Sequence, residues 1–311
     1  MTDERVLQTH DLSKRYGSRL AVDRLNLDVL QGEIFGFLGP NGAGKTTTIR
    51  MLLGLIRPTA GTVELFGQDL EAGRTRVLPR VGALIEAPAL YGYLSGRANL
   101  EVLAGPLRGI DRRRIDEVLS VVDLAGRQHD RVRSYSLGMK QRLGVAAAML
   151  NDPDLLILDE PANGLDPAGV VEMRDLLRSL VAGGATVFVS SHVLAEVQQL
   201  CDRVAIIARG RLVTEAPVAE LIRGRGDFEV KVDNPGALVA TLRQTTWGVP
   251  ARVQDGVVVT PSPTGAGRDL VRFLVEHDVY PDRIGERTQN LESIFLELTA
   301  GEGVGGTEQA A

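Results

Sequence analysis

Hydrophobic positions follow two alternating patterns from the start of the chain to about residue 222. Short continuous apolar runs, such as "IFGFL", "LLIL" and "TVFV", have the length of buried β-strands. The segments between them place apolar residues three or four positions apart, which is the spacing of a helix with one buried face. Strands that alternate with helices in this way predict an α/β domain built on a largely parallel sheet.

After "RGRG", residues 223–226, the pattern changes. "DFEVKVD" alternates as a strand does, and "ARVQDGVVVT" predicts a hairpin whose turn is Asp255-Gly256. "PGALVATLRQ" and "GRDLVRFLVEHD" have helical apolar spacing, and "DRIGE" is a further short strand. The resulting order, β-α-β-β-α-β, predicts a small α+β sandwich of ferredoxin-like type.

These patterns divide the chain into three parts. Residues 1–222 form the predicted α/β domain. Residues 227–300 form a predicted accessory α+β domain that ends in "NLESIFLELT", an amphipathic helix with Asn290 as N-cap. Residues 301–311 are rich in glycine and poor in apolar groups, so we expect them to be disordered. The sequence has no internal repeat, and one catalytic module per chain is expected.

The composition is that of an ordinary globular protein, with 44% hydrophobic and 24% charged residues among 311. A net charge of −5 gives no basic surface for coating nucleic acid. Cys201 is the sole cysteine, which excludes an intrachain disulfide or thiolate metal cluster and is consistent with a reducing, cytoplasmic compartment. The segment "MTDERVLQTH" lacks signal-peptide features, and no run approaches the roughly 18 apolar residues that cross a bilayer. We therefore expect any membrane role to depend on a partner protein.

The segment "IFGFLGPNGAGKTTTIRMLLGL", residues 34–55, carries the first chemical motif. An apolar strand leads into the pattern G-x4-G-K-T, and an amphipathic helix follows it. Glycines in such a loop let successive backbone N–H groups point at a phosphate, which the positive end of the helix also attracts. Lys45 would reach the β- and γ-phosphates of a nucleotide, and the Thr46 hydroxyl would bind Mg²⁺. The predicted phosphate-binding residues are Gly39, Pro40, Asn41, Gly42, Ala43, Gly44, Lys45, Thr46 and Thr47.

Further along the chain, "DLLILDEP" places two carboxylates at the end of an apolar strand. Burying Asp159 and Glu160 there is costly unless a cation or a reacting water uses them. Asp159 suits Mg²⁺, and Glu160 suits activation of an attacking water as general base. A solvated acidic turn is the alternative, and the presence of the phosphate loop makes it the weaker one.

Four segments occur in the order and approximate spacing of one family: "GPNGAGKTT", "SLGMKQR", "LLILDEPANGLDP" and "SSHVLAE". Over residues 5–222 the chain resembles the nucleotide-binding subunit of an ATP-binding cassette (ABC) transporter. The resemblance implies a P-loop NTPase of the cassette type, with a RecA-like core and a helical signature subdomain at about residues 87–150. It also implies ATP and Mg²⁺ as cofactors.

The segment "SLGMKQR" resembles the signature motif of that family, with Ser136 and Gly138 at the serine and second glycine of its usual core. In the family this motif closes over ATP held by the other subunit. Hydroxyl and backbone N–H groups at a helix start suit such a contact with a γ-phosphate. Leu137 and Met139 replace the usual glycine and glutamine, and the backbone donors survive these changes. An ordinary helix start capped by Ser136 is the alternative.

Four further residues are assigned by the resemblance. Tyr16 matches the aromatic residue that stacks on adenine, His192 the switch histidine at the γ-phosphate, and Asp166 the aspartate of a loop that crosses the dimer interface. Packing, a structural histidine and a helix N-cap are the respective alternatives. Glu86 stands where the family commonly has a glutamine that binds and senses Mg²⁺, and a carboxylate can also approach that ion.

The resemblance thus implies an ATPase with Glu160 and His192 as catalytic residues. Its implied metal ligands are Thr46, Asp159 and Glu86. Two copies of the chain would enclose two Mg-ATP molecules and dock on separately encoded transmembrane permease subunits, with residues 87–100 facing the permease. The protein would then lie at the cytoplasmic face of the cell membrane, without direct contact to nucleic acid.

"IEAPALY", "SLGMKQ" and "IFLELT" are similar to segments of bacitracin-type and other antibiotic-resistance exporters, which implies export. Three alternatives stay open. The first is a soluble ABC-type ATPase that acts as a clamp on a ribosome or nucleic acid. The others are a small-molecule P-loop kinase, which needs no signature segment, and a nucleotide sensor that does not turn over.

Overall fold

The computed structural model describes residues 4–107, 109–222, 227–287, 290–292 and 294–295. Among these residues a first compact unit ends at Val218, and a second begins at Ala219. Each unit has its own sheet structure and apolar core. The predicted disordered tail, residues 301–311, and residues 296–299 of the predicted last helix lie outside the described residues.

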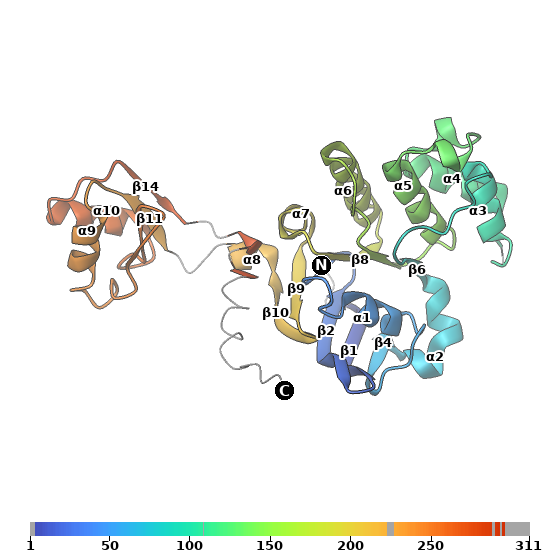
Figure 1. Ribbon diagram of the computed structural model, residues 1–311, viewed down its shortest axis with the longest axis horizontal. Coiled ribbons are helices and arrows are strands. Elements are labelled where there is room, and N and C mark those ends of the chain that lie inside the picture. Colours follow the sequence, from blue (N-terminus) through green and yellow to red (C-terminus); the bar gives the residue numbers. More distant parts are fainter. Residues whose placement is uncertain (1–3, 108, 223–226, 288–289, 293, 296–311) are drawn as a thin grey trace, which may run out of the picture. The chain divides into compact units, whose positions relative to one another are not determined.

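A six-stranded sheet forms the centre of the first unit (Figure 1). Its strands lie in the order β10-β9-β3-β8-β7-β6, and every neighbouring pair is parallel except β10-β9. The strands are β3 (Ile34–Leu38), β6 (Val81–Leu84), β7 (Leu155–Asp159), β8 (Thr186–Ser191), β9 (Arg203–Ala208) and β10 (Arg211–Pro217). Every residue of β3, β7 and β8 is buried. Central parallel strands are covered on both faces, which explains why continuous apolar runs predicted them.

An antiparallel sheet in the order β2-β1-β4-β5 forms a second layer. Its strands are β1 (Arg5–Tyr16), β2 (Arg19–Leu30), β4 (Ala60–Leu65) and β5 (Gln68–Asp69), and helices α1 (Lys45–Leu52) and α2 (Leu70–Val77) belong to the same region. One apolar core joins both sheets to α1: Leu7 and Leu65 come from the antiparallel sheet, Ile49 from α1, and Phe37 and Phe188 from the central sheet. Helix α1 therefore starts from a rigid support.

Helices α6 (Pro167–Ala182) and α7 (Leu194–Leu200) pack on the other face of the central sheet (Figure 1). Alternate residues of β3 show this division, because Phe35 and Phe37 point into the core that contains α1. Gly36 faces α7, where a Cβ would lie 2.8 Å from Val197 Cγ1. A glycine at this position lets α7 approach the sheet closely.

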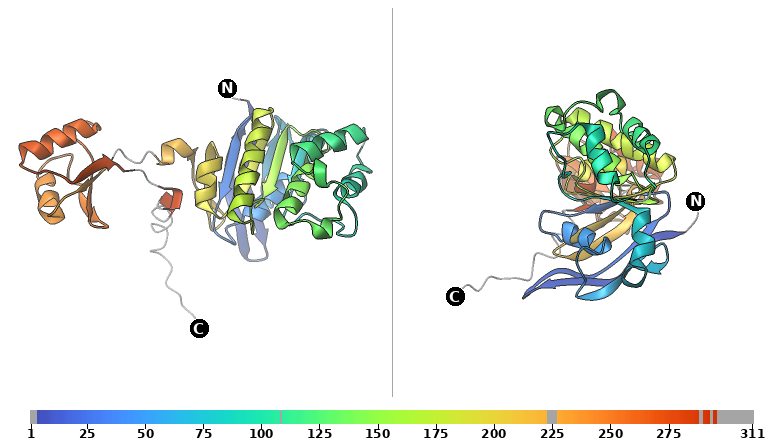
Figure 2. Two further views of the ribbon diagram at one scale, coloured as in Figure 1. Left: turned by 90° about the horizontal axis from the view of Figure 1, so that it is seen from above. Right: turned by 90° about the vertical axis from the view of Figure 1, so that its right-hand side faces the viewer.

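A group of three helices lies next to β6 (Figures 1 and 2). These helices are α3 (Gly96–Ala104), α4 (Arg112–Val121) and α5 (Leu137–Ala148). Short 3₁₀ turns occupy Leu78–Arg80, Ala125–Arg127 and Val132–Ser134. Asp111 caps α4 by accepting a hydrogen bond from Arg114 N, and Ser95 caps α3 in the same way from Ala98 N.

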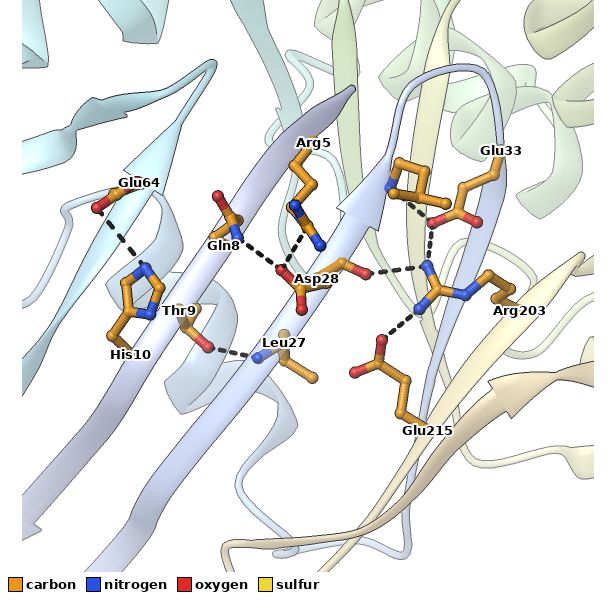
Figure 3. Close-up of polar contacts among 11 residues, drawn as sticks. Arg5, Gln8, Thr9, His10, Leu27, Asp28, Glu33, Glu64, Arg203 and Glu215 are labelled. Atoms are coloured by element: carbon orange, nitrogen blue, oxygen red, sulfur yellow. Dashed lines mark hydrogen bonds and ion pairs between the residues drawn. The ribbon is translucent and has the colours of Figure 1, made fainter. Parts of the chain in front are cut away.

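An ion network ties the two sheets of the first unit together (Figure 3). Arg203 on β9 donates to Glu33 Oε1 at 2.9 Å, to Glu215 Oε1 at 2.5 Å and to the carbonyl oxygen of Asp28 at 3.1 Å. Glu33 is 2% exposed and also accepts a hydrogen bond from Leu30 N. Burial raises the pKa of Glu33 and raises the pKa of Glu215 to about 7, although Arg203 lowers both.

The second unit contains a four-stranded antiparallel sheet in the order β12-β13-β11-β14. Its elements are α8 (Val218–Ile222), which begins in the first unit, then β11 (Phe228–Lys231), α9 (Pro235–Leu242), β12 (Arg252–Gln254), β13 (Val257–Thr260), α10 (Gly267–Glu276) and β14 (Arg283–Glu286). From β11 onward the elements follow the predicted order β-α-β-β-α-β, and the strand order is that of a ferredoxin-like sandwich. Within the part of the chain that the structure describes, no helix combines the length and apolar character that a membrane crossing requires.

Candidate functional site

The loop between β3 and α1, residues 39–44, opens onto a cleft. Gly44 precedes α1 with φ 110°, and a Cβ at this position would lie 2.7 Å from the carbonyl oxygen of Ala21. Only glycine fits both conditions. Helix α1 has no side-chain cap among the described residues, so its first N–H groups remain donors for an anion.

Lys45 is held beneath this loop and is only 6% exposed. Its Nζ donates to the carbonyl oxygen of Gly39 at 2.7 Å and to that of Pro40 at 3.4 Å. The same Nζ lies 3.2 Å from Glu160 Oε1. The loop therefore fixes a buried ammonium group. Glu160, the residue after β7, supplies the negative charge that balances it.

Thr46 and Asp159 meet at the carboxyl ends of the central strands. Thr46 Oγ1 donates to Asp159 Oδ2 at 2.9 Å, and Ser190 Oγ donates to Asp159 Oδ1 at 2.5 Å. Strand β8 lies between β3 and β7, and Ser190 is the direct pairing partner of Asp159. The sheet order thus places the Asp159 carboxylate, 4% exposed, beside the hydroxyl of Thr46 in the first turn of α1.

Glu160 lies between two basic side chains. One oxygen faces Lys45, and the other, Oε2, is 2.7 Å from His192 Nδ1. Because an ionised carboxylate only accepts hydrogen bonds, the imidazole nitrogen Nδ1 must carry the proton in this contact. Glu160 has φ 50°, and its N–H donates to the Ser190 hydroxyl at 3.0 Å. A non-glycine residue at positive φ is strained, and such strain concentrates at functional sites.

Lys45, Thr46 and Glu160 border a cleft of about 340 Å³. Its lining consists of Tyr16, Arg19, Ala21, Asn41, Gly42, Gly44, Lys45, Thr46, Thr47 and Glu160. Tyr16 is 49% exposed, and its ring lies under Lys14 Nζ, with 5.3 Å between the nitrogen and the ring centroid. The cleft thus offers an exposed aromatic ring on which a base can stack and N–H donors that can bind phosphate. This combination suits a nucleotide.

The predicted site residues that do not line this cleft include Ser136, Gly138 and Asp166. Ser136 caps α5 by accepting a hydrogen bond from Met139 N at 3.2 Å, and Asp166 caps α6 by accepting one from Gly169 N at 2.9 Å. Gly138 follows Ser136 in the first turn of α5. The helix-cap alternatives therefore hold within this chain, and contact of these residues with a nucleotide stays a prediction about a second copy.

Glu86, predicted as a metal ligand with Thr46 and Asp159, forms an ion pair with Arg50 instead. Its Oε1 accepts a hydrogen bond from Arg50 Nη2 at 2.7 Å, and its backbone has φ 59°. The side chain is 63% exposed. Arg50 belongs to α1, so this ion pair links the phosphate-loop helix to the segment that follows β6.

A larger cavity of about 520 Å³ lies on the other side of Glu160 and His192, between α6 and α7. Most of its lining residues are apolar, including Met173, Leu177 and Val197, which does not suit a triphosphate. Glu196 also lines it, and burial raises the pKa of that carboxyl group despite the opposing effect of His192.

The sequence interpretation missed two residues of the site. Ser190 holds both Asp159 and the backbone of Glu160, and its signal was the polar end of the run "TVFVSSH". Arg19 lines the cleft, and only its place three residues after Tyr16 pointed to it. In both cases the role depends on strand pairing, which spacing along the chain does not reveal.

Known proteins are similar to this chain in sequence and in fold. Residues 22–163 match the family described as ABC transporter. The bacitracin transport ATP-binding protein BcrA of Bacillus licheniformis is 43% identical over 303 residues, which cover 96% of this chain and 99% of that protein. The daunorubicin resistance ATP-binding protein DrrA3 of Streptomyces coeruleorubidus is 40% identical, over 92% of this chain and 93% of its own. A solved structure of an ATP-binding subunit of an ABC transporter has a TM-score of 0.62 and 30% identity, covering 71% of this chain and 93% of that one.

Proposed function

Because the chain belongs to the ATP-binding subunits of ABC transporters, we propose that it drives export by a separately encoded membrane permease. Members of this family bind and hydrolyse ATP, so the protein is an ATPase. Two relatives are named for bacitracin transport and daunorubicin resistance. Their names support the proposal that ATP hydrolysis drives export of an antimicrobial or drug-like compound. The chain would then act at the cytoplasmic face of the membrane, held there by the permease.

One observation carries the proposal: Lys45, Thr46, Asp159, Glu160 and His192 come from three separate segments and make direct side-chain contacts beside the phosphate loop. Each has the chemistry that ATP hydrolysis requires of its position. The signature segment is not part of this cleft, so one side of a bound nucleotide would lack protein donors. A second copy, placed head to tail, would supply those donors from Ser136 and Gly138.

In this proposal Glu160 accepts a proton from the water that attacks the γ-phosphate. His192 fixes the orientation of the carboxylate through its Nδ1 proton. Lys45 keeps its bonds to the Gly39 and Pro40 carbonyl oxygens and exchanges its contact with Glu160 for a phosphate oxygen. That exchange frees a Glu160 oxygen for water when ATP binds.

The donor set fits Mg²⁺, because Thr46 and Asp159 bring a hydroxyl and a carboxylate oxygen to within 2.9 Å. No cluster of three or more His, Cys, Asp or Glu side chains suited to a metal occurs among the described residues. Mg²⁺ does not require such a cluster, because it commonly takes one or two protein oxygens and completes its shell with phosphates and water. When bound, it would neutralise charge on the phosphate oxygens.

The permease would dock on the segment after β6. A groove of about 350 Å³ is lined almost wholly by apolar residues from β6, residues 87–90, α3 and α5. Tyr91 and Tyr93 stand next to it in the chain and are 46% and 68% exposed. Exposed aromatic and apolar side chains of this kind favour a protein partner. Glu86 lies at the start of the same segment, which would let the nucleotide site sense the permease.

The test compares ATP hydrolysis by the purified chain alone with hydrolysis after reconstitution in lipid with a candidate permease, a multi-span membrane protein to be sought among the neighbouring reading frames. Transport predicts that the permease stimulates turnover and that a transported compound stimulates it further. Unchanged turnover together with stable binding to ribosomes would replace this function with that of a soluble clamp.

A further inference from the structure

Arg19 begins β2 and is the direct pairing partner of Tyr16 across a tight turn formed by Gly17 and Ser18. Side chains of directly paired residues project to the same face of a sheet. Both Tyr16 and Arg19 accordingly line the phosphate-loop cleft. The turn between β1 and β2 thus presents an aromatic ring and a guanidinium group to the same space.

The guanidinium group also approaches the phosphate loop. Arg19 Nη2 lies 4.0 Å from the point where a Cβ on Gly42 would stand. Because Gly42 has no side chain, nothing from that residue separates the guanidinium from the loop backbone. Arg19 therefore lies beside the loop whose N–H groups would hold phosphate, in the cleft that Tyr16 also lines.

The charge of Arg19 is not balanced within the cleft. Among the charged residues of the lining, Lys45 and Glu160 pair with each other at 3.2 Å. Throughout the described residues, no ion pair or hydrogen bond involves the Arg19 guanidinium. Arg15, near the end of β1, differs, since its guanidinium donates to the carbonyl oxygen of Ser18. The cleft thus carries a net positive charge that is located on Arg19.

We propose that Arg19 is a nucleotide-binding residue that contacts the phosphate chain of ATP from the β1–β2 turn. The assignment rests on the proposed function of the cleft and adds a ligand contact outside the phosphate loop. A guanidinium stays protonated at any working pH and offers several N–H donors in one plane, which suits phosphate oxygens. Among the described residues no ion pair or hydrogen bond joins Arg19 to Glu160, the proposed general base, so we assign Arg19 to binding rather than to the chemical step.

Equilibrium binding of ATP, ADP and adenosine to the full chain tests this assignment. We expect Arg19→Ala to weaken ATP and ADP binding by about 5- to 20-fold and to leave adenosine binding unchanged. The Michaelis constant for ATP should rise by the same factor while kcat stays within about twofold, because the contact is equally present before and during the reaction. Arg19→Lys should recover part of the affinity, since it restores charge without the planar fork.

Arg57→Ala provides the matched control. The Arg57 side chain is 90% exposed and lies outside the cleft, so its removal changes the net charge equally without changing the site. Unaltered ATP affinity in Arg19→Ala, or an equal loss in Arg57→Ala, would overturn the contact and leave the proposed function intact. An equal loss of adenosine affinity would also overturn it, by assigning Arg19 to the nucleoside. Failure of the wild-type chain to bind ATP would instead overturn the proposed function.

Discussion

At the scale of single residues, the proposed chemistry depends on Glu160, whose two oxygens face Lys45 and His192. Glu160→Gln keeps the size of the side chain but cannot accept a proton from water. We expect turnover to fall by about 10²- to 10⁴-fold while ATP affinity stays within a few fold. Steady-state hydrolysis and equilibrium binding measure the two effects.

An exposed glutamate on α3, Glu101, provides the control for this change. It pairs with Arg97 at 3.7 Å and lies outside the cleft, so Glu101→Gln should hydrolyse ATP at the wild-type rate. Turnover of Glu160→Gln equal to that of this control would remove Glu160 from the role of general base.

Glu86 poses a different question, because the sequence predicted it as a Mg²⁺ ligand and the structure pairs it with Arg50. An exposed ion pair contributes about 0.2–1 kcal/mol, so Glu86→Gln should change the unfolding midpoint little. With the carboxylate committed to Arg50, we expect the Mg²⁺ concentration for half-maximal hydrolysis to change by less than about threefold. A titration with Mg²⁺ at saturating ATP decides the matter. A larger increase would mean that Glu86 leaves Arg50 to reach the metal.

At the scale of elements, sequence patterns predicted those parts whose structure is determined locally. The apolar runs gave β3, β7 and β8, because these strands are buried on both faces. Asp255 and Gly256 predicted a hairpin turn, and the structure agrees, because both residues have the positive φ of such a turn, 50° and 79°. The antiparallel sheet built on β1 and β2 was not predicted. Its pairing has several register shifts, and the choice of partner for a half-exposed strand is not local.

Residues at helix starts show why neither spacing along the chain nor the structure of one chain identifies every nucleotide contact. Ser136 and Asp166 each satisfy an N–H group of the helix that they begin. A capping residue and a nucleotide ligand use the same type of side chain at the same position, because both provide polar groups at the positive end of a helix. Ser136 and Asp166 therefore act as helix caps within this chain, and the same positions suit the contact with a partner's nucleotide that we propose.

The β9–β10 hairpin makes stability depend on pH through Glu215. Burial raises its pKa to about 7, well above the ordinary value of about 4.5, although Arg203 opposes this shift. The folded state then binds more protons than the unfolded state between these values, so this carboxyl group lowers stability as pH rises from about 4.5 to 7. We expect Glu215→Gln to reduce the difference in unfolding free energy between pH 5.5 and 8 by about 1–2 kcal/mol relative to wild type.

Urea unfolding of both proteins at the two pH values measures this difference. Glu71→Gln is a suitable control, since the side chain of Glu71 is 79% exposed and its nearest ion-pair partner is 3.7 Å away. A pH dependence in Glu215→Gln as large as that of wild type and of the control would contradict a raised pKa at this position.

At the scale of the whole molecule, the division of the proposed site between two copies is testable without the permease. In the proposed site Lys45 would hold nucleotide in the cleft of its own chain, whereas Gly138 belongs to the segment that would cap nucleotide in the other chain. Within its own chain Gly138 has room for a side chain, because the nearest atom to an added Cβ is Leu165 Cδ2 at 3.8 Å. Gly138→Asp should therefore fold normally and repel the γ-phosphate of the partner.

Lys45→Ala and Gly138→Asp should each hydrolyse ATP at less than about a tenth of the wild-type rate when assayed alone. Mixed in equal amounts, they form heterodimers in which one of the two sites combines a normal phosphate loop with a normal signature segment. We expect the mixture to recover roughly a quarter of wild-type activity, because about half of the dimers are mixed and each has one intact site. Recovery should grow with total protein concentration, since it requires association. Activity of the mixture equal to the mean of its parts would show that each chain completes its own site, and that the signature segment acts only as a helix start.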